Sequence, residues 1–202
     1  LGPNGAVLAR QGGNRNSVDI EVFHALRHAM TSGQAQTTDI YFGGAGSPSA
    51  RIDFIVPLLG SGKTPVGAVL LRIDPTSYLF PTLQFWPLPS DSAESLLWRR
   101  NDDVVMALSN FRNGGNTAGL FTLPLASSQA LAARLERGEV PYGEVVDSRD
   151  YRGVPVLGIG IQVSRTRWFI VSKVDRSEVI ANALPQALWI GAAGLLALLS
   201  LA

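Results

Sequence analysis

The feature that most constrains the fold is an order of predicted elements that occurs twice along the chain. In each half, a section with helical spacing of its apolar residues precedes three strand-like runs. Short polar turns rich in glycine, proline, serine and aspartate separate the runs. Consecutive strands joined by short turns pair antiparallel, so the sequence predicts the α+β class, with two units in tandem that each combine an antiparallel sheet with flanking helices.

The first unit is predicted over residues 1–85. A short strand is expected at 5–10 and a helix at 18–30, with Ser17 as its N-cap and Gly33 at its end. Three strand-like runs follow, at residues 39–42, 51–59 and 67–73. The turn between the last two runs is polar and contains two glycines, which predicts an antiparallel hairpin.

The second unit is predicted over residues 86–178, after a segment with two prolines, Pro87 and Pro89. It is expected to begin with a hairpin of strands 94–100 and 104–109. A helix is then expected at residues 127–137, capped by a serine and closed by Gly138. Three more strands are predicted at residues 143–147, 154–163 and 168–174.

The tail at residues 179–202 contains no charged residue, and most of its second half is apolar. Crossing the hydrocarbon core of a bilayer takes roughly 20 apolar residues, and Trp189 stands where an interfacial anchor is expected. We therefore expect the tail to be the start of a transmembrane helix. The alternative is a buried C-terminal core helix, although a helix in a soluble domain usually shows a polar stripe that this stretch lacks.

Composition and charge exclude several classes of function. The 202 residues are 46% hydrophobic and 16% charged, which suffices for one large core or two modest ones. The formal net charge is +1 and charges of both signs are interspersed, so no basic surface for a nucleic acid is expected. The absence of cysteine excludes disulfides, thiolate metal sites and a cysteine nucleophile, and it is compatible with an oxidising compartment.

Two short motifs suggest chemistry but fit it poorly. The segment 60–64, Gly-Ser-Gly-Lys-Thr, is similar to the end of a phosphate-binding P-loop, yet Pro57 stands where the first glycine belongs. A hairpin turn is the better interpretation. His24 and His28 are one helical turn apart, but Ala25 replaces the glutamate of the H-E-x-x-H motif and no third histidine exists. No Gly-x-Ser-x-Gly elbow occurs either, so we predict no catalytic residue, metal site or cofactor.

Three groups of segments together resemble a known family. They are residues 71–75 with 78–81, residues 86–100, and residues 150–158 with 168–175. As a set they resemble the double Cache sensor domain, a PAS-like periplasmic module of histidine kinases, diguanylate cyclases and chemoreceptors. The resemblance covers most of residues 50–178, whereas residues 1–45 are placed only by their order.

The resemblance implies a function in signalling. It implies that a small ligand binds in the membrane-distal unit, between the sheet and its helical side, and that the membrane-proximal unit relays binding to a membrane helix and a cytoplasmic output domain. It further implies a homodimer in the bacterial inner membrane, with this chain facing the periplasm and carrying no enzyme activity. The alternatives are a periplasmic module that binds a protein partner without a small ligand, and an enzyme tethered by its C-terminus.

Four residues are the candidates for ligand contact. Many amino-acid sensors of this family hold the ligand's ammonium group with an aspartate on the last distal strand, but residues 69–73 contain no acid. If Arg72 points inward with Tyr41 and Tyr78, the pocket would favour a small carboxylate or another anion, because a guanidinium binds such groups bidentately. Asp53 is the fourth candidate. The alternative interpretation is a solvent-facing residue at each position, or a cross-strand ion pair between Asp53 and Arg72.

Overall fold

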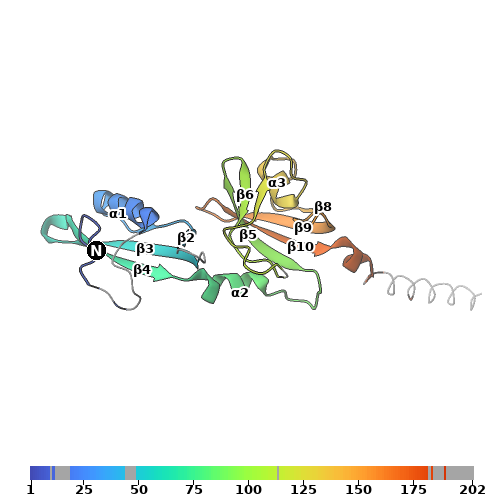
Figure 1. The fold of residues 1–202 in the computed structure, drawn as a ribbon, viewed down its shortest axis with the longest axis horizontal. Helices are drawn as coiled ribbons and strands as arrows, with labels where there is room; N and C mark the ends of the chain where they lie inside the picture. Colours follow the sequence, from blue (N-terminus) through green and yellow to red (C-terminus); the bar gives the residue numbers. More distant parts are fainter. Residues whose placement is uncertain are drawn as a thin grey trace, which may run out of the picture. The chain divides into compact units, whose positions relative to one another are not determined.

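The computed structural model describes residues 1–9, 11, 19–43, 49–112, 114–181, 183 and 189. The chain divides into two compact units, Leu1–Pro81 (unit 1) and Thr82–Ala202 (unit 2), which are described separately below. Figure 1 shows a sheet with a helix against it in each unit.

Unit 1 consists of a small antiparallel sheet and one long helix. In chain order its elements are α1 (Ile20–Ser32), β1 (Gln36–Thr37), β2 (Tyr41–Gly43), β3 (Ser49–Leu59), η1 (Ser61–Lys63), β4 (Pro65–Ile73) and η2 (Pro75–Ser77). β3 pairs antiparallel with β1, β2 and β4. A further helix, α2 (Leu79–Gln84), spans the division between the units.

The helix α1 covers one face of β3 and β4 (Figure 1). Leu26 and Ala29 lie three positions apart, on one side of the helix, and they pack on Ile55 and Ala68 of the sheet. The helix ends at Gly33, whose φ of 67° is left-handed, as its position in the sequence predicts. Ile55 and Ala68 therefore identify the sheet face that α1 covers. Residues two positions away on the same strands lie on that face as well, because side chains alternate between the two faces of a strand.

Two features of the predicted N-terminal region are not found. Residues 5–9 form no strand, because Gly2 donates a backbone hydrogen bond to Ala6 (2.7 Å) and closes a turn there. The N-cap of α1 is Asp19, and the predicted cap, Ser17, lies outside the described residues.

Unit 2 contains a six-stranded antiparallel sheet. Its elements are β5 (Glu94–Asn101), β6 (Val104–Ala107), β7 (Thr122–Pro124), α3 (Leu131–Glu136), β8 (Val145–Arg149), β9 (Pro155–Gln162) and β10 (Trp168–Asp175). The strand order is β7-β6-β5-β10-β9-β8. The first and last strands, β5 and β10, are therefore neighbours near the middle of the sheet, and residues 176–181 continue from β10 as a helix.

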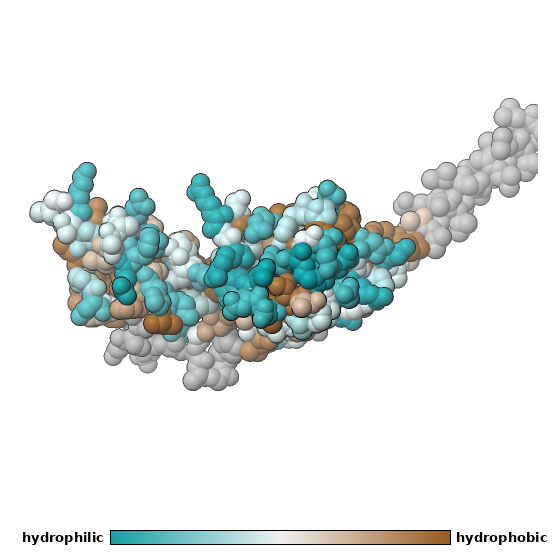
Figure 2. Space-filling view, turned by 90° about the horizontal axis from the view of Figure 1, so that it is seen from above, coloured by the Kyte–Doolittle hydropathy of each residue, from teal (hydrophilic) through white to brown (hydrophobic). Residues whose placement is uncertain are grey.

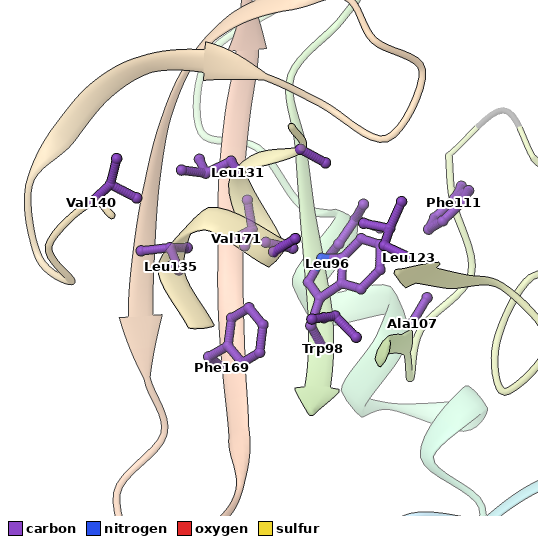
Figure 3. Packing of buried hydrophobic residues seen from close by; sticks show 14 residues of the cluster. Leu96, Trp98, Ala107, Phe111, Leu123, Leu131, Leu135, Val140, Phe169 and Val171 are labelled. Carbon is purple, nitrogen blue, oxygen red and sulfur yellow. The ribbon is translucent and has the colours of Figure 1, made fainter. Parts of the chain in front are cut away.

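The core of unit 2 lies between α3 and the sheet (Figure 3). Trp98, Phe169 and Val171 extend from β5 and β10, and Leu131 and Leu135 extend from α3. Gly158 and Gly160 make this close approach possible. A Cβ at either position would lie 2.6 Å or 2.4 Å from a leucine methyl group of α3.

The observed elements of unit 2 differ from the predicted ones in two places. The helix expected at 127–137 begins only at Leu131, because Ala130 has extended backbone angles and forms a bridge with Arg149. The strand β7 was not predicted. It is three residues long and pairs with β6, so it is too short to show an alternating pattern.

The predicted transmembrane helix at 179–202 falls mostly outside the described residues. Within the part of the chain that the structure describes, no helix is long and apolar enough to cross a membrane.

Candidate functional site

Three of the four predicted ligand residues meet on the face of the unit 1 sheet that α1 covers. β-Sheet register explains why: Asp53 pairs with Arg72, and Arg51 pairs with Tyr41. Directly paired residues share a face, as do residues two apart on β3, so these four side chains gather on one surface. Asp19 at the start of α1 is the fifth member of what we call the unit 1 polar cluster.

Asp53 is the centre of this cluster and is fully buried. Its carboxylate accepts hydrogen bonds from Arg72 Nε (2.9 Å) and Nη2 (2.8 Å), in a bidentate pair, and from the hydroxyl of Tyr41. Its backbone N–H donates to Thr38 Oγ1 at 2.9 Å. The cross-strand ion pair that the sequence offered as an alternative is thus present, and it compensates a buried charge.

Asp19 is held more loosely. Its Oδ2 atom accepts hydrogen bonds from Arg51 Nη1 and Arg72 Nη2 at 3.2 Å each. It also lies 3.3 Å from the hydroxyl of Tyr41, whose single proton is donated to Asp53. The Asp19 side chain is 26% exposed, whereas that of Asp53 is not exposed. The longer distances and the exposure show that Asp19 is held less tightly than Asp53.

Burial and the contacts within the cluster raise the pKa values of two of its members. Burial, followed by the hydrogen bond to Asp53, raises the pKa of Tyr41 far above its usual value of 10.0. The hydrogen bond to Asp53 raises the pKa of Arg72. Tyr41 is therefore a neutral hydrogen-bond donor and Arg72 a permanent cation at any physiological pH.

The fourth predicted residue, Tyr78, does not share this buried environment. It follows η2, and 78% of its surface is exposed. Sequence reasoning missed Asp19 because it placed this residue inside the predicted helix and took Ser17 as the N-cap. The N-cap is Asp19 itself, and an N-cap side chain normally bonds to its own helix. Here the side chain of Asp19 makes no such bond and turns to the sheet instead. From the sequence, Arg51 could be placed only on the same face of its strand as Asp53, two positions away.

A second charged cluster is buried in unit 2. Lys173 of β10 is 4% exposed, and its Nζ lies 3.3 Å from Asp150, 3.5 Å from Glu94 and 3.6 Å from Asp175. The same Nζ donates to the carbonyl of Ser92 at 3.0 Å. These groups satisfy one another. The cavity beside Asp150 and Lys173 has a volume of only about 20 Å³, which is too small for an organic ligand, so we interpret the cluster as part of the framework of unit 2.

Glu178 links the two chain segments that lie directly before β5 and directly after β10. Its carboxylate accepts hydrogen bonds from Ser90 Oγ (2.7 Å), from the backbone of Asp91 and Ser92, and from the hydroxyl of Ser92. Ser92 Oγ also accepts from the backbone of Asp175 at 2.9 Å. The segment that enters β5 is thereby tied to the helical segment that follows β10.

These hydrogen bonds, with Ser92 first, lower the pKa of Glu178 from 4.5 to about 2. A carboxyl whose folded pKa is depressed stabilises the fold fully above its unfolded pKa, and the contribution is lost as the pH falls from about 4.5 toward 2. We expect Glu178→Gln to show a smaller drop in stability across this interval than the wild-type protein, measured by urea unfolding at several pH values. Glu144→Gln, at an exposed position, is the control and should keep the wild-type pH dependence. An unchanged drop in Glu178→Gln would contradict the assignment.

The described residues offer no group of three or more potential metal ligands, and His24 and His28 remain a pair on α1. Residues 60–64 form the predicted hairpin turn between β3 and β4, with Gly62 and Lys63 at positive φ. Such a strand-to-strand turn lacks the helix N-terminus of a P-loop.

Comparison with solved structures identifies the fold. An extracellular domain attributed to a histidine kinase, mmHK1S-Z3, aligns with 79% of this chain at a TM-score of 0.53 and 13% identity, and 55% of its own length is covered. The periplasmic sensory domain of the Campylobacter jejuni chemoreceptor Tlp1 aligns with 77% of the chain (TM-score 0.49, 14% identity, 56% of its length). The ligand-binding domain of the Pseudomonas fluorescens chemoreceptor CtaA, solved with L-leucine, aligns with 83% (TM-score 0.47, 14% identity, 64% of its length).

No family model and no curated protein matches the sequence. The chain spans a little over half the length of the first two of these solved domains, and at such low identity the similarity concerns the fold alone. The TM-score of 0.53 to mmHK1S-Z3 shows that this chain has the fold of that extracellular domain, in agreement with the Cache-type domain that its sequence resembles.

Proposed function

We propose that this chain is the extracytoplasmic sensing part of a membrane-bound signalling receptor, and that unit 1 binds a small ligand at its polar cluster. The observation that supports this most is the cluster itself. Two guanidinium groups, two carboxylates and a phenol meet where α1 begins to cover the sheet, at the location that the family resemblance implies for a ligand.

The ligand is a small carboxylate or another anion. Asp53 is bound bidentately and fully buried, so it stays with Arg72 as part of the site. Asp19 instead places one carboxylate oxygen against Tyr41, Arg51 and Arg72 at 3.2–3.3 Å. A ligand carboxylate can take this position, because the guanidinium groups of Arg51 and Arg72 would form charge-assisted hydrogen bonds with it. Asp19 then moves away, together with the start of α1.

A screen of small mono- and dicarboxylates and amino acids by thermal shift tests this proposal. A ligand at a hundred times its dissociation constant stabilises the protein by about 2.7 kcal/mol. We expect Tyr41→Phe to weaken the binding of the ligand found by about tenfold, since the hydroxyl that accepts a hydrogen bond from Arg72 Nη2 (2.8 Å) and holds this guanidinium at the ligand position is lost. Tyr142→Phe is the matched control, because Tyr142 likewise donates to a carboxylate, that of Glu136 at 2.6 Å, in unit 2. A ligand whose affinity is the same in Tyr41→Phe and wild type would show that the cluster is not the site.

Relay is the second part of the proposal. In unit 1 the helix α1 precedes the four antiparallel strands β1 to β4, and in unit 2 the helix α3 precedes three, β8 to β10. From this similar order we infer that the units are tandem copies of one sensor module, with unit 1 distal and unit 2 proximal to the membrane. The uncharged residues 179–202 would then enter the inner membrane, and the contacts of Glu178 would pass a displacement of the entering segment to that helix. A ligand that prefers one of two arrangements shifts their populations, so the relay requires no chemistry in this chain. Dimerisation and a cytoplasmic output domain belong to the same proposal.

An alternative is a module that binds a protein partner, and one observation favours it. The face of the unit 1 sheet opposite α1 exposes a row of large apolar side chains, each at least 39% exposed: Phe54, Val56, Leu58, Val69, Leu71 and Ile73. Exposed apolar surfaces of this kind often mark interfaces. If the screen yields no ligand, this face is where a partner would be sought.

A further inference from the structure

Unit 2 contains a polar hollow that lies apart from the unit 1 cluster. It has a volume of about 280 Å³ and lies between α3, β8 and the start of the helical segment 176–181. Its lining is formed by Gln129, Arg134, Asp147, Ser148, Arg149, Pro155 and Arg176. The lining thus includes three arginines and one aspartate. Much of the surface of unit 2 seen in Figure 2 is hydrophilic, which fits a site for a charged molecule rather than for an apolar one.

The arginines are held in place but not saturated. Arg134 Nη1 donates to Ser148 Oγ at 3.0 Å, and its Nε donates to the carboxylate of Glu139 at 3.3 Å. Ser148 is only 6% exposed, so it fixes Arg134 from the floor of the hollow. Arg149 donates one N–H group to the carbonyl of Gly153 at 2.7 Å, and Arg176 Nη1 lies 2.9 Å from Asp147. A guanidinium carries five N–H donors. The contacts with described residues therefore leave several donors of the three arginines available.

The volume and charge of the hollow select a small, doubly charged anion. Guanidinium groups recognise phosphate with paired hydrogen bonds, and three of them around one space suit a tetrahedral oxyanion better than a planar carboxylate, which two can saturate. The volume is at the lower limit for sites of small molecules, which excludes a nucleotide-sized ligand. We propose that this hollow binds a phosphate group, either as free phosphate or as the headgroup of a phosphate ester such as a lipid.

Binding of an anion in the hollow would affect the helical segment 176–181, which follows β10. Arg176 is the first residue of the helical segment that follows β10, and its partner in the hollow is Asp147 on β8. An anion in the hollow competes with Asp147 for Arg176 and adds a contact to the start of this segment. Occupancy therefore stabilises one position of the helix that leaves the sheet, independently of any ligand in unit 1.

Isothermal titration at low ionic strength with inorganic phosphate, and separately with glycerol 3-phosphate, tests the site. We expect saturable binding of at least one probe, weakened about tenfold or more in Arg149→Gln and in Arg176→Gln, because each variant loses charge-assisted hydrogen bonds. Tighter binding of glycerol 3-phosphate would identify a lipid headgroup as the source, and equal or tighter binding of inorganic phosphate would identify free phosphate.

The matched control is Arg100→Gln. Arg100 is exposed on β5 and, like Arg149, donates to a backbone carbonyl, that of Asp102. It should bind both probes as the wild type does. Both arginine variants alter exposed side chains, and circular dichroism verifies their folding. The proposal is overturned if neither probe saturates at millimolar concentration, or if Arg100→Gln weakens binding as much as Arg149→Gln does.

Discussion

Lys173→Met should lower the free energy of unfolding of unit 2 by about 3–5 kcal/mol, the usual cost of removing one partner from a buried ion pair. The side chains of Glu94 and Asp150 are each 3% exposed, so the substitution leaves two buried carboxylates without their common cation. Arg152 lies 2.6 Å from Asp150 and compensates part of that charge from the surface. All four tryptophans of the chain follow residue 81, so tryptophan fluorescence during urea unfolding reports on unit 2.

The control is a cation at an exposed position of the same unit. Arg100 is exposed on β5, and Arg100→Met should change the stability of unit 2 by no more than about 0.5 kcal/mol. Unpaired buried carboxylates take up protons more readily. The loss of unfolding free energy caused by Lys173→Met should therefore be smaller at pH 5 than at pH 7. A deficit that is equal at both pH values would mean that lost packing, not lost charge, is responsible.

Arg72→Met should destabilise unit 1 by a similar amount, about 3–5 kcal/mol, because it leaves Asp53 charged and fully buried. Unit 1 contains no tryptophan, so hydrogen exchange of the β3 amides is the suitable measurement. Exchange in β9 and β10 of unit 2 should be unchanged. Arg27→Met, at an exposed position of α1, is the control for loss of an arginine.

A second substitution separates the charge of Asp53 from the other effects of Arg72→Met. In Arg72→Met/Asp53→Asn no buried charge remains, and the amide oxygen can still accept the hydrogen bond from Tyr41. This double variant should recover most of the protection that the single variant loses. If it is no more stable than Arg72→Met, the buried charge is not what makes Arg72 necessary.

Local sequence patterns determined much of the secondary structure. Helical spacing and Gly33 predicted α1 to within two residues, and alternation with polar turns predicted the strands β3, β4, β5 and β10. These signals are local, since they depend on residues within about four positions of one another. The sequence also offered the pair of Asp53 and Arg72, because a hairpin register makes residues opposite each other neighbours.

Tertiary structure alone decided which charged groups meet. Asp19 and Arg72 are 53 positions apart, and Ser92 and Glu178 are 86 apart, so no periodic pattern relates them. Lys173 forms ion pairs with carboxylates from β5, from the turn before β9 and from the end of β10. Tyr78 was expected beside Arg72 but is exposed, because η2 turns the chain directly after β4. Spacing along a strand or helix specifies which side chains share a face, whereas packing of that face against another element specifies which distant side chain completes the site.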